Sequence, residues 1–279
     1  MYNHTNRMLP TLNNGMVAKS PWELSHPSDW EGLEFAWFPH LTGGGTKVID
    51  AGPHGRDAHF VGGLAVSHWV NGPYGRCVDL SNGSTTAEES LHCWQWGPSS
   101  SVWNTEATGH YIANFDRITI IAAQMPKDAD GNSNGIYGRT RNIPSGDETP
   151  ISLNVNDNDA ETNRHGLFQG IDGSFTGSGS SATGSVDNKW RIVGGRWASD
   201  FKPELWTDGI LREKRSSATA NPSGSANNSV HAGGAFRHTG GSRSCNGYLG
   251  PVLVWSRALD DRVFGDIQAD IARVIRKVA

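Results

Sequence analysis

The sequence is poor in charge and in cysteine, and each shortage excludes a class of protein. Only 19% of the residues are charged, and the formal net charge is −4. No long basic stripe occurs, so nucleic acid is not an expected partner. The three cysteines, Cys77, Cys93 and Cys245, lie too far apart for a CxxC metal pair or a disulfide framework. They are expected to be buried free thiols.

Long apolar segments are also missing. No apolar run is long enough to cross a bilayer, so no membrane partner is expected. Residues 1–10 (MYNHTNRMLP) lack the apolar core of a signal peptide. This predicts synthesis in the cytoplasm, unless a lysis or phage-assembly route carries the protein outside.

Glycine and tryptophan are abundant, at 35 and 11 of 279 residues, and short alternating segments recur between turn signals. Leu33, Phe35 and Trp37 alternate with their neighbours, which predicts a half-buried strand. Asp208-Gly209 predicts a tight hairpin turn. Many short strands without alternating helices indicate an all-β, antiparallel two-sheet sandwich. The other predicted strands are residues 77–80, 110–115, 118–122, 151–155, 166–171, 190–197, 204–211, 230–236 and 248–255.

The expected organisation is one large domain with two appendages. Residues 1–29 are interpreted as an extended N-terminal arm and residues 30–258 as the sandwich. Residues 259–279 are predicted to form an amphipathic helix, because apolar residues recur at helical spacing after a capping aspartate. Residues 173–185 and 216–229 are rich in Ser and Gly and are predicted to be long surface loops.

Three blocks of the sequence resemble the laminin-G-like (LamG) family of concanavalin A-like lectin/glucanase folds. They are LEFAWFPHLTGGGTKVIDAGPHGRDA, WRIVGGRWASDFKPELWTDGIL and GYLGPVLVWSRALDDRVFGDI, and they span most of residues 31–270. The resemblance implies a jelly-roll sandwich. In some relatives the turn in the first block helps to hold calcium. Here Arg56 stands where the family usually has asparagine, which weakens the case for calcium at Asp50.

A second calcium candidate lies in the segment KDADGNSNG. Asp128, Asp130, Asn132 and Asn134 occupy alternate positions and carry the hard oxygen ligands that Ca²⁺ prefers. The spacing is not that of an EF-hand. The alternative interpretation is an Asx-rich turn that joins two strands.

A carboxylate cluster follows the strand predicted at residues 151–155. Asp157, Asp159 and Glu161 would share one face of an extended strand. Glucanases of this superfold use a similar array of acids. A polar hairpin turn explains the segment NVNDNDAETN better, so no catalytic residue is predicted.

A group of aromatic and polar residues forms the candidate ligand site. Aromatic faces can stack on the apolar faces of sugar rings while polar groups orient the hydroxyls. The alternative is that these aromatic residues only anchor a long loop. The candidate residues are Trp94, Trp96, Trp103, His110, Tyr137 and Arg139.

The sequence therefore predicts a non-enzymatic binding or structural module. LamG-like domains without a signal peptide resemble those of tailed-phage virion proteins, which implies a homo-oligomer in a virion that contacts other virion or surface proteins. Cell-surface or extracellular localisation is the alternative. A second functional hypothesis is a lectin that binds host glycans, and a third, less favoured, is a glycoside hydrolase. No cofactor other than calcium is considered.

Overall fold

The computed structural model describes most of the strands and the C-terminal helix. The described ranges are residues 31–61, 64–72, 75–80, 90–93, 117–126, 134–143, 146–155, 165–171, 174–179, 189–197, 202–214, 228–232, 234–235, 243–244 and 247–277. The predicted arm at residues 1–29 and the predicted strand at 110–115 lie outside them. The domain boundaries stay a prediction.

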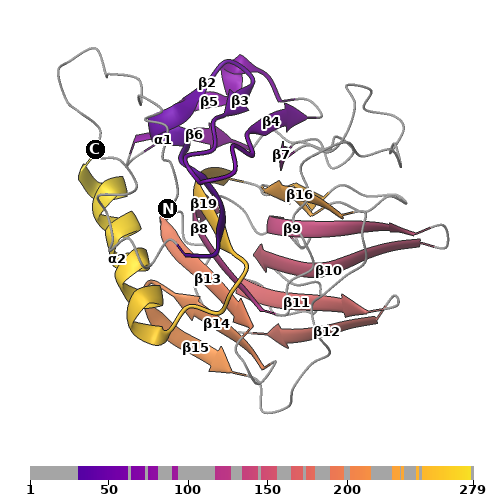
Figure 1. The fold of residues 1–279 in the computed structure, drawn as a ribbon. Coiled ribbons are helices and arrows are strands. Elements are labelled where there is room, and N and C mark those ends of the chain that lie inside the picture. Colours follow the sequence, from indigo (N-terminus) through magenta and orange to yellow (C-terminus); the bar gives the residue numbers. More distant parts are fainter. Residues whose placement is uncertain are drawn as a thin grey trace.

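Two antiparallel sheets make up the body of the described structure (Figure 1). Sheet A has the order β15-β14-β13-β8-β19-β6-β5, and β1 also pairs with β19. Its strands are β1 (Leu33–Trp37), β5 (Trp69–Gly72), β6 (Gly75–Asp79), β8 (Ile118–Pro126), β13 (Arg191–Trp197), β14 (Pro203–Thr207), β15 (Ile210–Lys214) and β19 (Gly247–Trp255).

Sheet B has the order β12-β11-β10-β9-β16-β7-β4-β3-β2. Its strands are β2 (Gly43–Gly44), β3 (Lys47–Val48), β4 (Ala58–Val61), β7 (Ser90–Cys93), β9 (Asn134–Ile143), β10 (Gly146–Val155), β11 (His165–Ile171), β12 (Ser174–Gly179) and β16 (Asn228–Ala232). A short ribbon of β17 (Gly234–Ala235) and β18 (Arg243–Ser244), a short helix α1 (Pro39–Thr42) and a 3-10 turn at Val66–His68 complete these elements.

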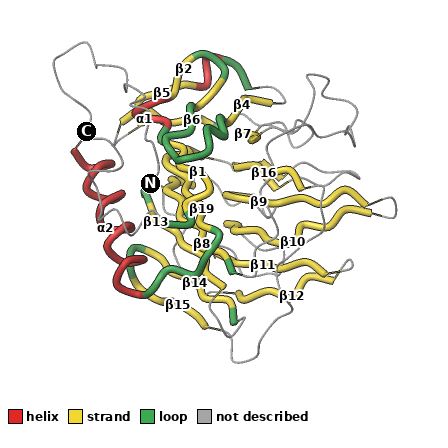
Figure 2. The backbone as a smooth tube through the Cα atoms, in the orientation of Figure 1, coloured by secondary structure: helices red, strands yellow, loops and turns green. Residues whose placement is uncertain are grey.

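The prediction of an all-β sandwich with a C-terminal helix is confirmed (Figure 2). Two local predictions differ. The predicted loop at residues 173–185 contains β12, which pairs with β11. Residues 134–143, where no strand is predicted, form β9 between β10 and β16. Hydrogen bonds from neighbouring strands stabilise both polar segments as strands, although neither has an apolar pattern of its own.

The central strands of sheet A are buried on both faces, whereas the edge strand β15 is exposed. Along β8, Ile118, Ile120 and Ala122 lie in the cluster between the two sheets, whereas Ile121 and Ala123 lie in a second cluster. The second cluster includes residues of the C-terminal helix α2 (Asp261–Lys277). The prediction of half-buried strands is therefore wrong for these central strands, because α2 covers the face that a two-layer sandwich would leave in water.

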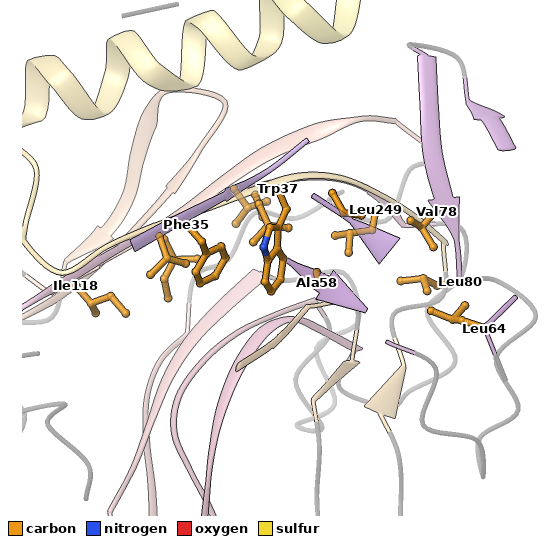
Figure 3. Close-up of a cluster of buried hydrophobic side chains, with 14 of the residues drawn as sticks. Phe35, Trp37, Ala58, Leu64, Val78, Leu80, Ile118 and Leu249 are labelled. Carbon is orange, nitrogen blue, oxygen red and sulfur yellow. The ribbon is translucent and has the colours of Figure 1, made fainter. Parts of the chain in front are cut away.

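The inner cluster is closed by aromatic side chains from β1 (Figure 3). Phe35 and Trp37 are fully buried, and their rings stack with centroids 4.2 Å apart. Leu33 lies in the outer cluster instead, because a bulge between Leu33 and Phe35 changes the face on which the strand's residues lie. Cys77 is a buried free thiol, as expected.

Helix α2 packs on the outer face of sheet A. Asp260 caps its start by accepting the Val263 N–H at 2.9 Å. Phe264 is fully buried and meets Trp206 edge to face, with centroids 5.1 Å apart. In the part of the chain that the structure describes, no helix is both long and apolar enough to cross a membrane.

A buried ion pair joins the start of α2 to sheet A. The Arg196 guanidinium on β13 pairs with Glu204 on β14 and reaches Asp261 at 2.6 Å. Arg196 and Glu204 are 5% and 2% exposed. Lys214 also contacts Glu204, at 2.8 Å. Arg196 thus connects β14 to the first residue of α2. Removing one member of the pair would leave the other as an uncompensated buried charge.

The Asp208-Gly209 hairpin prediction is confirmed. Both residues have positive φ, 53° and 79°, as a type I′ turn between β14 and β15 requires. Asp208 Oδ1 accepts the Ile192 N–H at 3.0 Å, and the Gly209 N–H donates to Gln268 of α2 at 2.9 Å. The turn is thus attached to both β13 and the helix.

The closeness of α2 to sheet A can be measured with a glycine pair. A Cβ on Gly194 would overlap the buried Phe264 ring, so Gly194→Ala should lower the unfolding free energy by about 1–3 kcal/mol. Gly265 has no atom within 4 Å of the corresponding position, so Gly265→Ala should stabilise the helix by about 0.5–1 kcal/mol. Urea unfolding of both variants provides the comparison. Equal effects would contradict the packing described.

The buried ion pair gives a second prediction. Arg196→Ala leaves the Glu204 carboxylate buried without its main partner, so we expect a loss of about 3–5 kcal/mol in unfolding free energy. The control is Arg262→Ala, which removes an exposed pair with Asp266 and should change stability by less than about 0.5 kcal/mol. Chemical denaturation measures both. A loss as small as the control's would mean that the pair does not hold the helix.

Candidate functional site

The register of sheet B separates a core-facing side from an outward side. Val48 and Ala58 are fully buried in the cluster between the sheets, so their rows face the core. Directly opposed residues in an antiparallel sheet share a face. The core-facing row through Ala58 is Val48, Ala58, Cys93, Val230, Arg139 and Ile151. The next core-facing row is Phe60, Leu91, Ala232, Tyr137, Leu153, Leu167 and Ser178.

The row between them belongs to the outward face, because side chains alternate along each strand. It crosses every strand of the sheet. From edge to edge it reads Gly44, Lys47, His59, His92, His231, Gly138, Ser152, Phe168 and Gly177. Basic and imidazole residues occupy one half, and small residues with an aromatic residue occupy the other.

The half of the outward face on β10–β12 carries two aromatic positions among small ones. Phe168 opposes Gly177, and Phe175 opposes Gly170. The two phenylalanines are diagonal neighbours on adjacent strands, with Cα atoms about 7–8 Å apart, a distance that aromatic side chains can span. Ser152 opposes Phe168 on the other side. The register therefore places two phenylalanine positions beside two glycine positions on this face.

The opposite half of the row ends in a short hairpin of β3 and β4. Lys47 and His59 are directly opposed, and Lys47 pairs with Asp57 at 3.1 Å. Burial, and to a lesser degree the nearby Lys47 charge, lowers the pKa of His59 below its ordinary value, while Asp57 opposes this shift. His59 is therefore biased towards the neutral imidazole at physiological pH.

Asp50 positions this hairpin relative to sheet A. Its carboxylate is buried and accepts three backbone N–H groups, those of Ala36, Gly52 and Arg56, at 2.7–2.8 Å. Its own N–H donates to Asp57 at 2.9 Å. Burial raises the pKa of the Asp50 carboxyl, and the three N–H donors and Arg56 only oppose that shift.

This turn also explains the departure from the LamG pattern. Arg56 is nearly buried and pairs with Glu34 of β1, while the Trp37 indole donates to the Arg56 carbonyl at 2.7 Å. Backbone donors and the Arg56 side chain thus occupy the surroundings of Asp50 that a cation would need. The residues present suit a hydrogen-bonded turn rather than a calcium site. Among the side chains that the structure describes, which do not include those of β7 and β16, no three His, Cys, Asp or Glu are grouped to hold a metal ion.

The predicted ligand residues fall into two groups. Tyr137 and Arg139 lie on β9, and their register places them in the core-facing rows. Trp94, Trp96, Trp103 and His110 lie outside the described residues, although Trp94 directly follows β7. The binding role of all six stays a prediction. The phenylalanines of β11 and β12 were not among the candidates, since the row that joins them to the outward face is visible only in the strand register.

One of the four proposed calcium ligands lies within the described residues and three lie outside them. Asn134 is the first residue of β9 and opposes Val155 of β10. Asp128, Asp130 and Asn132 lie outside the described residues, as do Asp157 and Glu161 of the acidic cluster.

The Asp50 turn leads to a testable result. Asp50→Ala leaves three N–H groups without their acceptor, so we expect the unfolding free energy to fall by at least about 3 kcal/mol, given about 1–3 kcal/mol per orphaned buried group. Hydrogen exchange of the Ala36, Gly52 and Arg56 amides should accelerate together. Asp266→Ala on the exposed side of α2 is the control and should change neither quantity. Unchanged exchange in Asp50→Ala would show that the carboxylate does not organise the turn.

Comparison with known proteins places the fold. No family model and no curated protein sequence matches the chain. Among solved structures, a Trypanosoma rangeli sialidase in complex with sialic acid matches with a TM-score of 0.56 and 14% identity, over 95% of this chain and 36% of the sialidase. Domain 4 of AbnA, a GH43 extracellular arabinanase from Geobacillus stearothermophilus, in complex with arabinotriose, matches with a TM-score of 0.57 and 10% identity, over 85% of this chain and 98% of that domain.

The chain has the fold of β-sandwich domains found in carbohydrate-active proteins. These sandwiches are related to concanavalin A-like jelly rolls, so the resemblance is upheld at the level of fold. The chain spans about a third of the length of the sialidases it matches. The assignment to the LamG family itself stays a prediction.

The expectation of a non-enzymatic module is corrected by these matches. The solved structures that share the fold include sialidases and a domain of an arabinanase. The same sandwich therefore occurs in polypeptides that process glycans, and an all-β architecture gives no ground for excluding catalysis. A sandwich fold and a polar turn therefore do not exclude an enzymatic role for this chain.

Proposed function

We propose that this chain is a glycan-recognising β-sandwich domain, and that the glycan lies on the outward face of sheet B. The observation that carries the proposal is the pair Phe168 and Phe175, set among Gly170, Gly177 and Ser152 in adjacent rows of that face. The sugar-binding hypothesis drawn from the sequence is kept, but the surface is located on different residues.

The chemistry of this face suits a sugar. A pyranose or furanose ring has an apolar face of C–H groups that stacks on an aromatic ring. Its hydroxyls need nearby polar partners, and Ser152 and Asn154 lie on the same outward side of β10. Glycines opposite both phenylalanines leave space beside the aromatic rings, so a flat ligand can lie along the strands.

The fold comparison supports the same class of ligand. The matching sialidase structure holds sialic acid, and the matching arabinanase domain holds arabinotriose. These two sugars are therefore the first probes for this chain. The comparison gives no support to a virion role, so glycan recognition replaces particle assembly as the leading function. The homo-oligomeric state, protein partners and localisation expected from the sequence stay predictions.

Binding is tested with a glycan array that includes sialosides and arabino-oligosaccharides, followed by calorimetry with the best ligand. We expect Phe168→Ala to weaken binding by about fivefold to 150-fold, since stacking on an aromatic side chain contributes about 1–3 kcal/mol. Leu211→Ala, at an exposed site on β15 of the other sheet, is the control and should bind as the parent does. Trp94→Ala and Trp96→Ala test the surface expected from the sequence.

The variants distinguish the two surfaces. Loss of binding in Trp94→Ala or Trp96→Ala, with Phe168→Ala unchanged, would move the site away from β11 and β12. No binding to any glycan at protein concentrations that saturate known lectins would overturn the proposal. Because proteins of this fold include enzymes, the same oligosaccharides are also assayed for cleavage. Any cleavage that persists in Asp157→Asn and Glu161→Gln would exclude the acidic cluster as its source.

A further inference from the structure

Three histidines occupy directly opposed positions on three neighbouring strands of sheet B. His59 on β4 opposes His92 on β7, and His92 opposes His231 on β16. Directly opposed positions have Cβ atoms about 4.5–5.5 Å apart and belong to the same face. Histidine accounts for only 11 of the 279 residues, so two successive matches across strands are a rare coincidence.

We propose that His59, His92 and His231 form a binding site for a divalent transition-metal ion of the zinc class on the outward face of sheet B. Imidazole is the nitrogen ligand that Zn²⁺, Ni²⁺ and Cu²⁺ prefer, with Zn–N bonds of about 2.0–2.1 Å. An ion above β7 is one strand spacing, about 4.8 Å, from each outer strand. That is within reach of an imidazole ring and one metal–nitrogen bond. Three protein ligands leave a fourth position for water or another donor.

The surroundings of His59 suit a metal ligand. A metal binds the neutral imidazole, and His59 is biased towards that form by burial. The neighbouring cation Lys47 is paired with Asp57, which reduces its repulsion of a bound ion. Asp50 holds the turn between Lys47 and His59, because its carboxylate accepts the Arg56 N–H and its own N–H donates to Asp57.

The site is distinct from both calcium candidates and from the aromatic half of the row. Calcium takes oxygen ligands, whereas this row offers nitrogen. Gly138 and Ser152 separate His231 from Phe168 along the row. The proposal therefore stands or falls without any glycan.

The test is a calorimetric titration of the full chain, first stripped of metal with a chelator, with ZnCl₂ and NiCl₂ at pH 7.5. We expect one ion per chain, no comparable heat from CaCl₂, and loss of binding at pH 5.5, where ordinary imidazoles are protonated. His92→Ala and His231→Ala should each abolish the one-to-one binding. His54→Ala, at an exposed turn outside the row, should keep it.

Fold integrity is monitored by circular dichroism. Zinc should raise the melting temperature of the parent and of His54→Ala, but not that of His92→Ala or His231→Ala. If His92→Ala fails to fold, His231→Gln on the neighbouring strand gives the same test. Unchanged stoichiometry and affinity in folded His92→Ala or His231→Ala would overturn the proposal, as would the absence of zinc and nickel binding by the parent. Glycan binding is measured separately, so failure of one result leaves the other intact.

Discussion

The buried carboxylate of Asp50 is the interaction on which the arrangement of the two sheets depends. It lies in the turn between β3 and β4 of sheet B and accepts the N–H of Ala36 on β1 of sheet A. A buried carboxylate is costly unless donors surround it, and its raised pKa shows that burial outweighs the donors. Removing the Asp50 side chain would leave three backbone N–H groups without their acceptor. The main effect of Asp50 is therefore to fix the geometry of the β3–β4 turn relative to β1.

The geometry held by this turn extends across the outward face of sheet B. Because Asp50 and Asp57 secure the β3–β4 hairpin, Lys47 and His59 keep a constant register with β7, β16 and β9. The row they begin passes from basic residues through histidines to glycines and Phe168. The positions of the proposed metal site and of the proposed glycan surface therefore lie at opposite ends of the same row.

Sheet A serves a different purpose, because it is enclosed between sheet B and α2. Its outer face would otherwise leave Ile121, Leu253 and Trp255 in water, and the helix covers them with Phe264 and Ile267. Arg196 beneath the helix start links the sheet to the helix, because it pairs with Glu204 of β14 and with Asp261 of α2.

The sequence alone determined the fold class, the final helix and the Asp208-Gly209 turn, because each depends on local spacing and backbone preference. It left the helix cap open between Asp260 and Asp261, and the structure assigns it to Asp260. It also indicated sugar binding, on aromatic residues close in the chain. Strand register depends on hydrogen bonds between segments far apart in sequence, so no local pattern places His59, His92 and His231 in one row or Phe168 beside Phe175. For the same reason, the polar segments of β9 and β12 are strands only because their neighbours supply partners, and the half-buried pattern of β8 fails because α2 returns to cover it.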